Sequence, residues 1–69
     1  MVKEALKNLD KKLLRVKLVE AGFSPGAIDV AFSRGVIPMK MVPSMERLTA
    51  ISAKFWCFPE VYNLNGERR

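Results

Sequence analysis

The sequence predicts an all-α fold, a small bundle of four to five short helices built around a helix-turn-helix. Apolar residues recur at spacings of three and four through residues 2–21, which is the period of a helix that buries one face. Residues 22–38 then contain a glycine turn, a serine that can cap a helix, and an exit with glycine and proline. Two helices joined by such a short glycine turn are typical of a helix-turn-helix.

The first 21 residues predict two helices, at residues 2–8 and 11–21, with a break near Leu9 and Asp10. Asn8 and Asp10 are both residue types that cap the start of a helix. Their position inside the apolar pattern indicates where the second helix begins. One continuous helix over the same residues is the alternative.

The helix expected at about residues 24–33 has a start signal and a stop signal. Ser24 can accept a hydrogen bond from the first turn, and Pro25 suits the first helical position. Gly22 before the helix and Gly35 after it can adopt the left-handed conformation with which helices commonly end. As the second helix of the helix-turn-helix, this segment is the expected recognition helix, the helix that would contact DNA.

A further helix is expected at about residues 42–52, because Pro38 forbids regular helix in the connector before it and Pro43 suits its first turn. Most aromatic residues of the chain follow in residues 53–63. This extended or irregular tail either covers the core of its own chain or forms a dimer interface. The residues expected at that interface are Phe55, Trp56, Phe58, Val61 and Tyr62.

The length of 69 residues allows one domain, expected at residues 1–63, followed by a flexible basic tail at residues 64–69. A domain of this size buries only about 60% of the surface of its unfolded chain, so a second subunit is expected to help stabilise it. The sequence has 12 Lys and Arg against 7 Asp and Glu, a net charge of +5. This excess favours a polyanionic partner.

The sequence lacks most side chains that catalytic and metal sites need. It contains no His, and Cys57, its one cysteine, lies between two aromatic residues, where a small buried hydrophobe is expected. We therefore expect no enzyme activity, no metal site, and no cofactor or small-molecule ligand. No signal peptide and no apolar stretch of about 20 residues is present, so we expect a soluble cytoplasmic protein with no membrane segment.

The expected recognition helix offers unusual groups for DNA contact. Its outward positions hold no Arg, Gln or Asn, the side chains that most often bind guanine and adenine in the major groove. Asp29 can instead accept a hydrogen bond from a cytosine amino group, and Val30 can contact a thymine methyl group. Basic residues near the motif are expected on the phosphates. The complete set of expected DNA contacts is Ser24, Pro25, Gly26, Asp29, Val30, Ser33, Arg34, Lys40, Lys11, Lys12 and Arg15.

Three stretches in this order resemble the small Cro-like repressors and related prophage regulators, over about residues 9–63. They are the turn, helix and exit at residues 22–38, the pattern Val42-Pro43-x-x-Glu46-Arg47-Leu48-Thr49, and the closing Phe58-Pro59-Glu60-Val61-Tyr62. The resemblance implies a lambda-repressor-like helical domain that binds operator DNA as a homodimer and represses transcription. It also implies a phage or prophage origin, in a bacterial or phage-infected cell. Lys17 and Leu18 depart from the family, which has an apolar and then a small residue there.

Two other classes of function remain open. A protein-interaction module, such as a phage-encoded inhibitor or an antitoxin-like partner, would use the aromatic tail and the exposed apolar residues. The lack of Arg, Gln and Asn on the recognition helix favours this alternative. The basic, amphipathic residues 2–21 also suggest a helix at a membrane surface, although the turn and helices that follow make them part of a packed domain.

Overall fold

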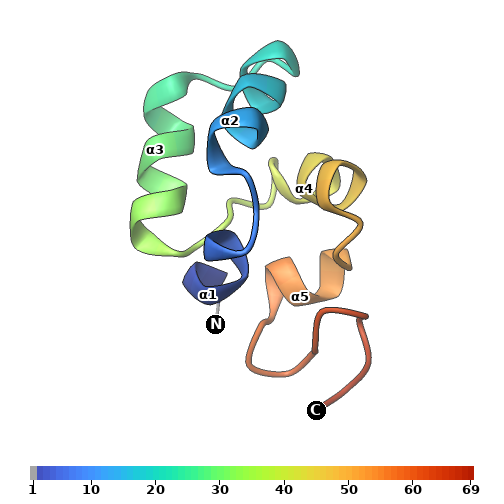
Figure 1. Cartoon of the computed structure of the whole chain (residues 1–69). Coiled ribbons are helices and arrows are strands. Elements are labelled where there is room, and N and C mark those ends of the chain that lie inside the picture. The colour runs from blue at the N-terminus through green and yellow to red at the C-terminus, as the bar shows by residue number, and fades with distance from the viewer. Residues whose placement is uncertain (1) are drawn as a thin grey trace.

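The computed structural model describes residues 2–69, and over these residues the chain forms helices and no sheet (Figure 1). The helices are α1 (Val2–Lys7), α2 (Lys11–Glu20), α3 (Pro25–Arg34), α4 (Val42–Thr49) and α5 (Ala53–Cys57). The prediction of a small all-α bundle is confirmed. The prediction of an extended or irregular tail is wrong for residues 53–57, which form α5, because Ser52 caps this helix by accepting a hydrogen bond from the N–H of Lys54 at 3.2 Å.

Residues 2–20 form two helices because Asp10 caps the second one. Its carboxylate accepts a hydrogen bond from the N–H of Leu13 at 3.1 Å, and its own backbone is extended, so α1 cannot continue into α2. The two-helix prediction is confirmed, and the single continuous helix is wrong. α2 then ends at a turn in which Gly22 has φ +104°.

Helix α3 has the start and the end that the sequence indicates. The Ser24 hydroxyl accepts from the N–H of Ala27 at 3.2 Å, and Pro25 stands in the first turn. Gly35 ends the helix with φ +70° and donates its N–H to the carbonyl of Ala31 at 2.9 Å. The helix predicted at residues 24–33 is therefore correct to within a residue at each end.

Helix α4 is shorter than predicted, ending at Thr49 and not at Ser52. Ala50 takes a left-handed conformation with φ 60° and stops the helix without a glycine. The carboxylate of Glu46 accepts from the N–H of Ala53 at 2.5 Å, which ties the start of α5 to α4. The prediction that the helix continues to residue 52 is wrong. The chain bends at Ala50 because Glu46 binds the start of the next helix, and no residue pattern around position 50 marks this bend.

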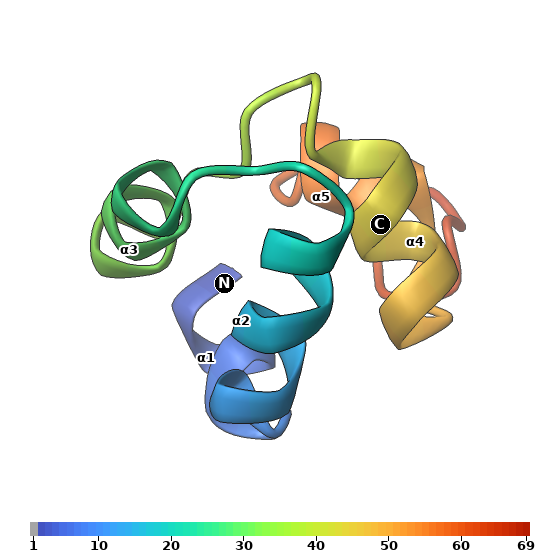
Figure 2. The same cartoon turned by 90° about the horizontal axis from the view of Figure 1, so that it is seen from above.

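The core lies where all five helices meet. α3 packs on α1 and α2, and α4 packs on α2 and α5. Figure 2 shows α3 at one edge of the molecule, with α4 and α5 on the opposite side. The buried side chains are Val2, Ala5, Leu6, Leu14, Leu18, Ile28, Ala31, Ile37, Met41, Val42, Met45, Phe55 and Trp56.

Residues 58–69 fold back on the helices as a loop below α5 (Figure 1). Arg69 donates its backbone N–H to Val61 at 2.9 Å, and the N–H of Ser52 donates to the carbonyl of Leu64 at 3.0 Å. Gly66 lies against Ser52, whose hydroxyl oxygen is 2.4 Å from the position that a β-carbon of residue 66 would take. The segment expected as a flexible tail is thus hydrogen-bonded to the domain.

Candidate nucleic-acid interface

Helices α2 and α3 form a helix-turn-helix with a glycine turn of defined geometry. The N–H of Phe23 donates to the carbonyl of Leu18 at 3.1 Å, and the N–H of Gly22 donates to that of Val19 at 3.0 Å. This pair of bonds around a left-handed glycine is the Schellman motif. It turns the chain so that α3 packs against α2 at an angle, since α3 is seen end-on and α2 obliquely in Figure 2.

One face of α3 is buried and the other is free. Ile28 and Ala31 lie in the core, where Ile28 is completely buried, as is Leu18 of α2. The residues expected to point outward are all exposed: Gly26, Asp29, Val30 and Ser33. Ser24 and Pro25, at the start of the helix, are exposed as well. The structure therefore brings this group of expected contacts together on one surface.

An ion pair joins the two helices of the motif. Arg15 donates from Nε to Oδ1 of Asp29 at 2.8 Å and from Nη2 to Oδ2 at 3.2 Å, a bidentate geometry. These hydrogen bonds hold the pKa of Asp29 below its ordinary value. Burial raises this pKa by a smaller amount, and the positive charge of Arg15 lowers it further. The pKa of Arg15 is raised for the same reasons, so both groups stay charged.

This pair changes the expected role of both residues. Asp29 was expected as an acceptor for cytosine and Arg15 as a phosphate contact, but each is bound to the other. Arg15 neutralises the one carboxylate on α3, which would otherwise repel DNA. The sequence does not indicate this pair, because the two residues are fourteen positions apart and only the turn brings them together.

Several basic residues lie near the motif outside this pair. Lys11 and Lys12 are exposed in the first turn of α2, Arg34 is exposed in the last turn of α3, and Lys40 is exposed in the loop that follows. Among residues 2–69, Arg15 and Asp29 form the one ion pair, so these four cations have no acidic partner there.

Lys3 lies beside the end of α3, a contact that the sequence does not predict. Its Cγ lies 2.7 Å from the position that a β-carbon of Gly35 would take, so its stem crosses the end of the helix beside Arg34. The contact between α1 and α3 places it there, and no sequence motif marks it.

A shallow hollow of about 450 Å³ adjoins the free face of α3. Val30 and Val36 are 50% and 65% exposed. Arg34 is the one charged residue in the lining of the hollow. The lining consists of Gly26, Ala27, Val30, Ala31, Arg34, Val36 and Pro38.

The five residues expected at a dimer interface divide into two groups. Phe55 and Trp56 are 1% and 2% exposed and pack edge to face in the core, with ring centroids 5.2 Å apart. For these two the alternative of a lid over the core is the correct one, because the small helical core needs their volume. Phe58 and Val61 are exposed, and Tyr62 is half-buried with Lys54 Nζ 5.4 Å from its ring centroid.

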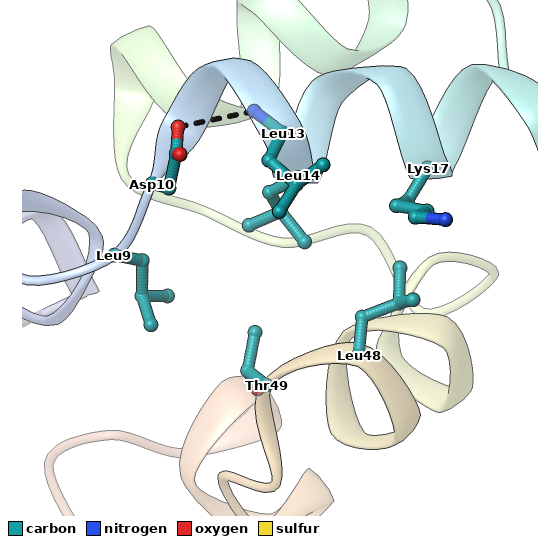
Figure 3. A pocket seen from close by; sticks show the side chains of 7 residues that line it. All are labelled: Leu9, Asp10, Leu13, Leu14, Lys17, Leu48 and Thr49. Atoms are coloured by element: carbon teal, nitrogen blue, oxygen red, sulfur yellow. Dashed lines mark hydrogen bonds between the residues drawn. The ribbon is translucent and has the colours of Figure 1, made fainter.

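A second apolar hollow, of about 210 Å³, lies between α2 and α4 (Figure 3). The figure shows Leu9, Leu14 and Leu48 around the opening, with Lys17 beside it. Leu13, on the same side of α2, is more than half exposed. This groove is the other surface on which a partner could bind.

Comparisons of the chain with protein-family models, with curated proteins and with solved structures gave no match. Between residues 2 and 69, no three His, Cys, Asp or Glu side chains come close enough to hold a metal ion. None of the helices in that range is long and apolar enough to span a bilayer.

Proposed function

We propose that this protein is a sequence-specific DNA-binding regulator that binds operator DNA as a homodimer and represses transcription. It would do so in the manner of the Cro-like phage and prophage regulators that its sequence resembles. The observation that carries the proposal is the free face of α3, a helix that is capped at both ends and joined to α2 by the Arg15–Asp29 pair.

A helix of this kind meets the needs of major-groove binding. The groove admits one α-helix, and a helix-turn-helix directs the first residues of its second helix toward the base edges. Ser24 and Pro25 occupy that position in α3 and are exposed. The caps and the ion pair hold the helix in one orientation, so binding does not require it to become ordered.

Charge supports the same proposal. The net charge of +5 favours a polyanion, and neutralisation of Asp29 leaves the face of α3 without a free carboxylate. Lys3 and Arg34 at the end of α3, with Lys11 and Lys12 at the start of α2, are the cations that would contact phosphates. Each such contact releases counterions and makes the affinity depend on salt.

The proposal is tested by a mobility shift on DNA fragments from the genetic neighbourhood of the protein, with competitor DNA and a series of salt concentrations. We expect a discrete complex that survives competitor and weakens steeply with salt. Arg34→Ala should weaken binding to all sequences and reduce the slope of log K against log salt by about 0.9, the value for one phosphate contact.

Arg47→Ala is the matched control, because Arg47 is an exposed arginine on α4, away from α3, and its loss changes the net charge equally. An equal effect of both variants would show that net charge alone drives retention. Absence of any discrete complex would contradict the proposal.

The groove between α2 and α4 supports a second candidate, a protein-interaction module. Its lining is mainly leucine side chains, and Leu13 extends it onto the exposed side of α2. A partner held there would bind with little dependence on salt. Leu13→Gln would weaken such binding and leave the net charge and the DNA affinity unchanged, which separates the two candidates.

A further inference from the structure

We infer that the hollow beside α3 binds the 5-methyl groups of thymine, so that thymines facing Val30 and Val36 determine the operator sequence. This inference rests on the proposed function and specifies which base the same face of α3 recognises. It follows from the apolar side chains on the free face of α3 and from the pairing of Asp29 with Arg15.

Hydrogen bonding cannot supply most of the base recognition on this face. The one carboxylate on this face, that of Asp29, already accepts two hydrogen bonds from Arg15 and is therefore not free to accept one from a base. Gly26 has no side chain, and Ser33 carries a short hydroxyl that can pair with either kind of base edge. None of the outward positions 26, 29, 30 and 33 holds a side chain that forms a bidentate pair with guanine or adenine, and Arg34, in the last turn of α3, is assigned to the phosphates.

Apolar contact is the form of recognition that remains. In the major groove the thymine methyl is the one apolar group that the four base pairs present, so an apolar side chain distinguishes thymine from the other bases. Val30 and Val36 are exposed and line the hollow together with small residues such as Ala27. Apart from Arg34, the lining is apolar. Methyl groups fit such a lining.

The charge beside the hollow indicates a nucleic acid and not an apolar protein segment. Arg34 lines the hollow, and the stem of Lys3 crosses the adjacent Gly35. A methyl group in the major groove lies between two phosphate backbones, so a partner that fills the hollow with methyl groups also brings anions to these cations. No β-carbon occupies residue 26, and nothing lies within 4 Å of its position, so the duplex can approach the backbone there.

The test begins with selection from a pool of duplexes that contain random base pairs. We expect the selected sequence to contain thymines. In that duplex, deoxyuridine then replaces each thymidine, which removes only the methyl group and keeps the hydrogen-bonding edge. Affinity should fall about fourfold for each methyl group that the hollow buries, the ratio expected for loss of one buried carbon.

Two protein variants show whether Val30 senses the methyl group. At the thymine that faces Val30, Val30→Ala should bind the thymine and uracil duplexes equally, whereas the difference at a thymine that faces Val36 should remain. Val16→Ala is the control, because Val16 is a 52% exposed valine on α2 outside the hollow, and it should keep the full difference. Circular dichroism verifies that both variants are folded.

The outcomes separate this inference from the proposed function. The inference would be overturned by a selected sequence without thymine, by equal binding of wild type to the two duplexes, or by a difference that Val30→Ala leaves unchanged at every thymine. Each of these results would leave a DNA-binding protein. A pool that yields no enriched sequence would overturn both.

Discussion

Asp29 is a single residue whose chemistry is decided by its neighbour. An exposed carboxylate on a DNA-binding helix would repel phosphates, whereas the same carboxylate bound to Arg15 presents no net charge. The pair also joins α2 to α3, so it contributes to the orientation of α3. Both side chains are exposed, so salt and solvent weaken the interaction.

Asp29→Asn is expected to lower the melting temperature near neutral pH, because it removes the ionic part of this interaction. The pKa of Asp29 lies below its ordinary value of 3.8, so folding favours the charged form. The stabilisation is therefore fully present well above pH 3.8 and is lost as the pH falls through the lowered pKa of the folded protein. Melting curves from pH 7 to pH 2 at low salt measure it.

The melting temperatures of wild type and Asp29→Asn should converge at the acid end of this series. Glu20→Gln is the control, because Glu20 is an exposed carboxylate on α2 outside the one ion pair of residues 2–69. A difference between wild type and Asp29→Asn that persists at pH 2 would show that the pair does not stabilise the fold.

At the scale of one element, helix α3 depends on its two ends. A helix of 10 residues gains little stability on its own, and its first turn has N–H groups without a partner inside the helix. Ser24 satisfies one of these groups at the N–H of Ala27. In the proposed DNA complex, the residues that the cap orders are those that would enter the major groove.

Ser24→Ala should therefore destabilise the domain by about 1 kcal/mol, which lowers the melting temperature by about 4–8 °C in a domain of this size. Ser33→Ala, the same change on the exposed face of α3 away from the cap, is the control and should lie within about 0.5 kcal/mol of wild type. Urea unfolding of both variants measures the difference. Equal stability of the two would show that the cap does not contribute.

At the scale of the whole molecule, the carboxyl-terminal loop lies outside a core that is small for an independent domain, and it packs on a helix of that core. Residues 2–69 bury few large side chains, among them Phe55 and Trp56 of α5. The loop of residues 58–69 then packs on the start of α5, where Gly66 lies against Ser52. Docking of the loop thus stabilises α5, the helix that supplies Phe55 and Trp56 to the core.

A comparison of two glycines measures this docking. Gly66 and Gly22 both have positive φ, +80° and +104°, so a β-carbon at either one is expected to be destabilising by about 1–2 kcal/mol. A β-carbon at residue 66 also meets the Ser52 hydroxyl, whereas one at residue 22 meets nothing within 4 Å. Gly66→Ala should therefore destabilise more than Gly22→Ala in urea unfolding. The opposite order would show that the loop does not dock.

The sequence predicted most helix boundaries because they depend on contacts within one turn. Asp10, Ser24 and Gly35 act on residues three or four positions away, so their effect is visible in the order of the residues. The end of α4 was not predictable in this way. It depends on Ala50 in a conformation that alanine rarely adopts and on Glu46 reaching to the next helix.

The candidate site shows the same division. The sequence by itself determined the helix-turn-helix, the exposure of the outward positions of α3 and the basic character of the chain, because periodicity, caps and charge are local or additive properties. Only the tertiary structure decided that Asp29 pairs with Arg15, that Lys3 lies beside Gly35, and that Phe55 and Trp56 are core residues. These contacts join residues that are far apart in the chain, and the packing of the helices, which no short stretch of sequence encodes, brings them together.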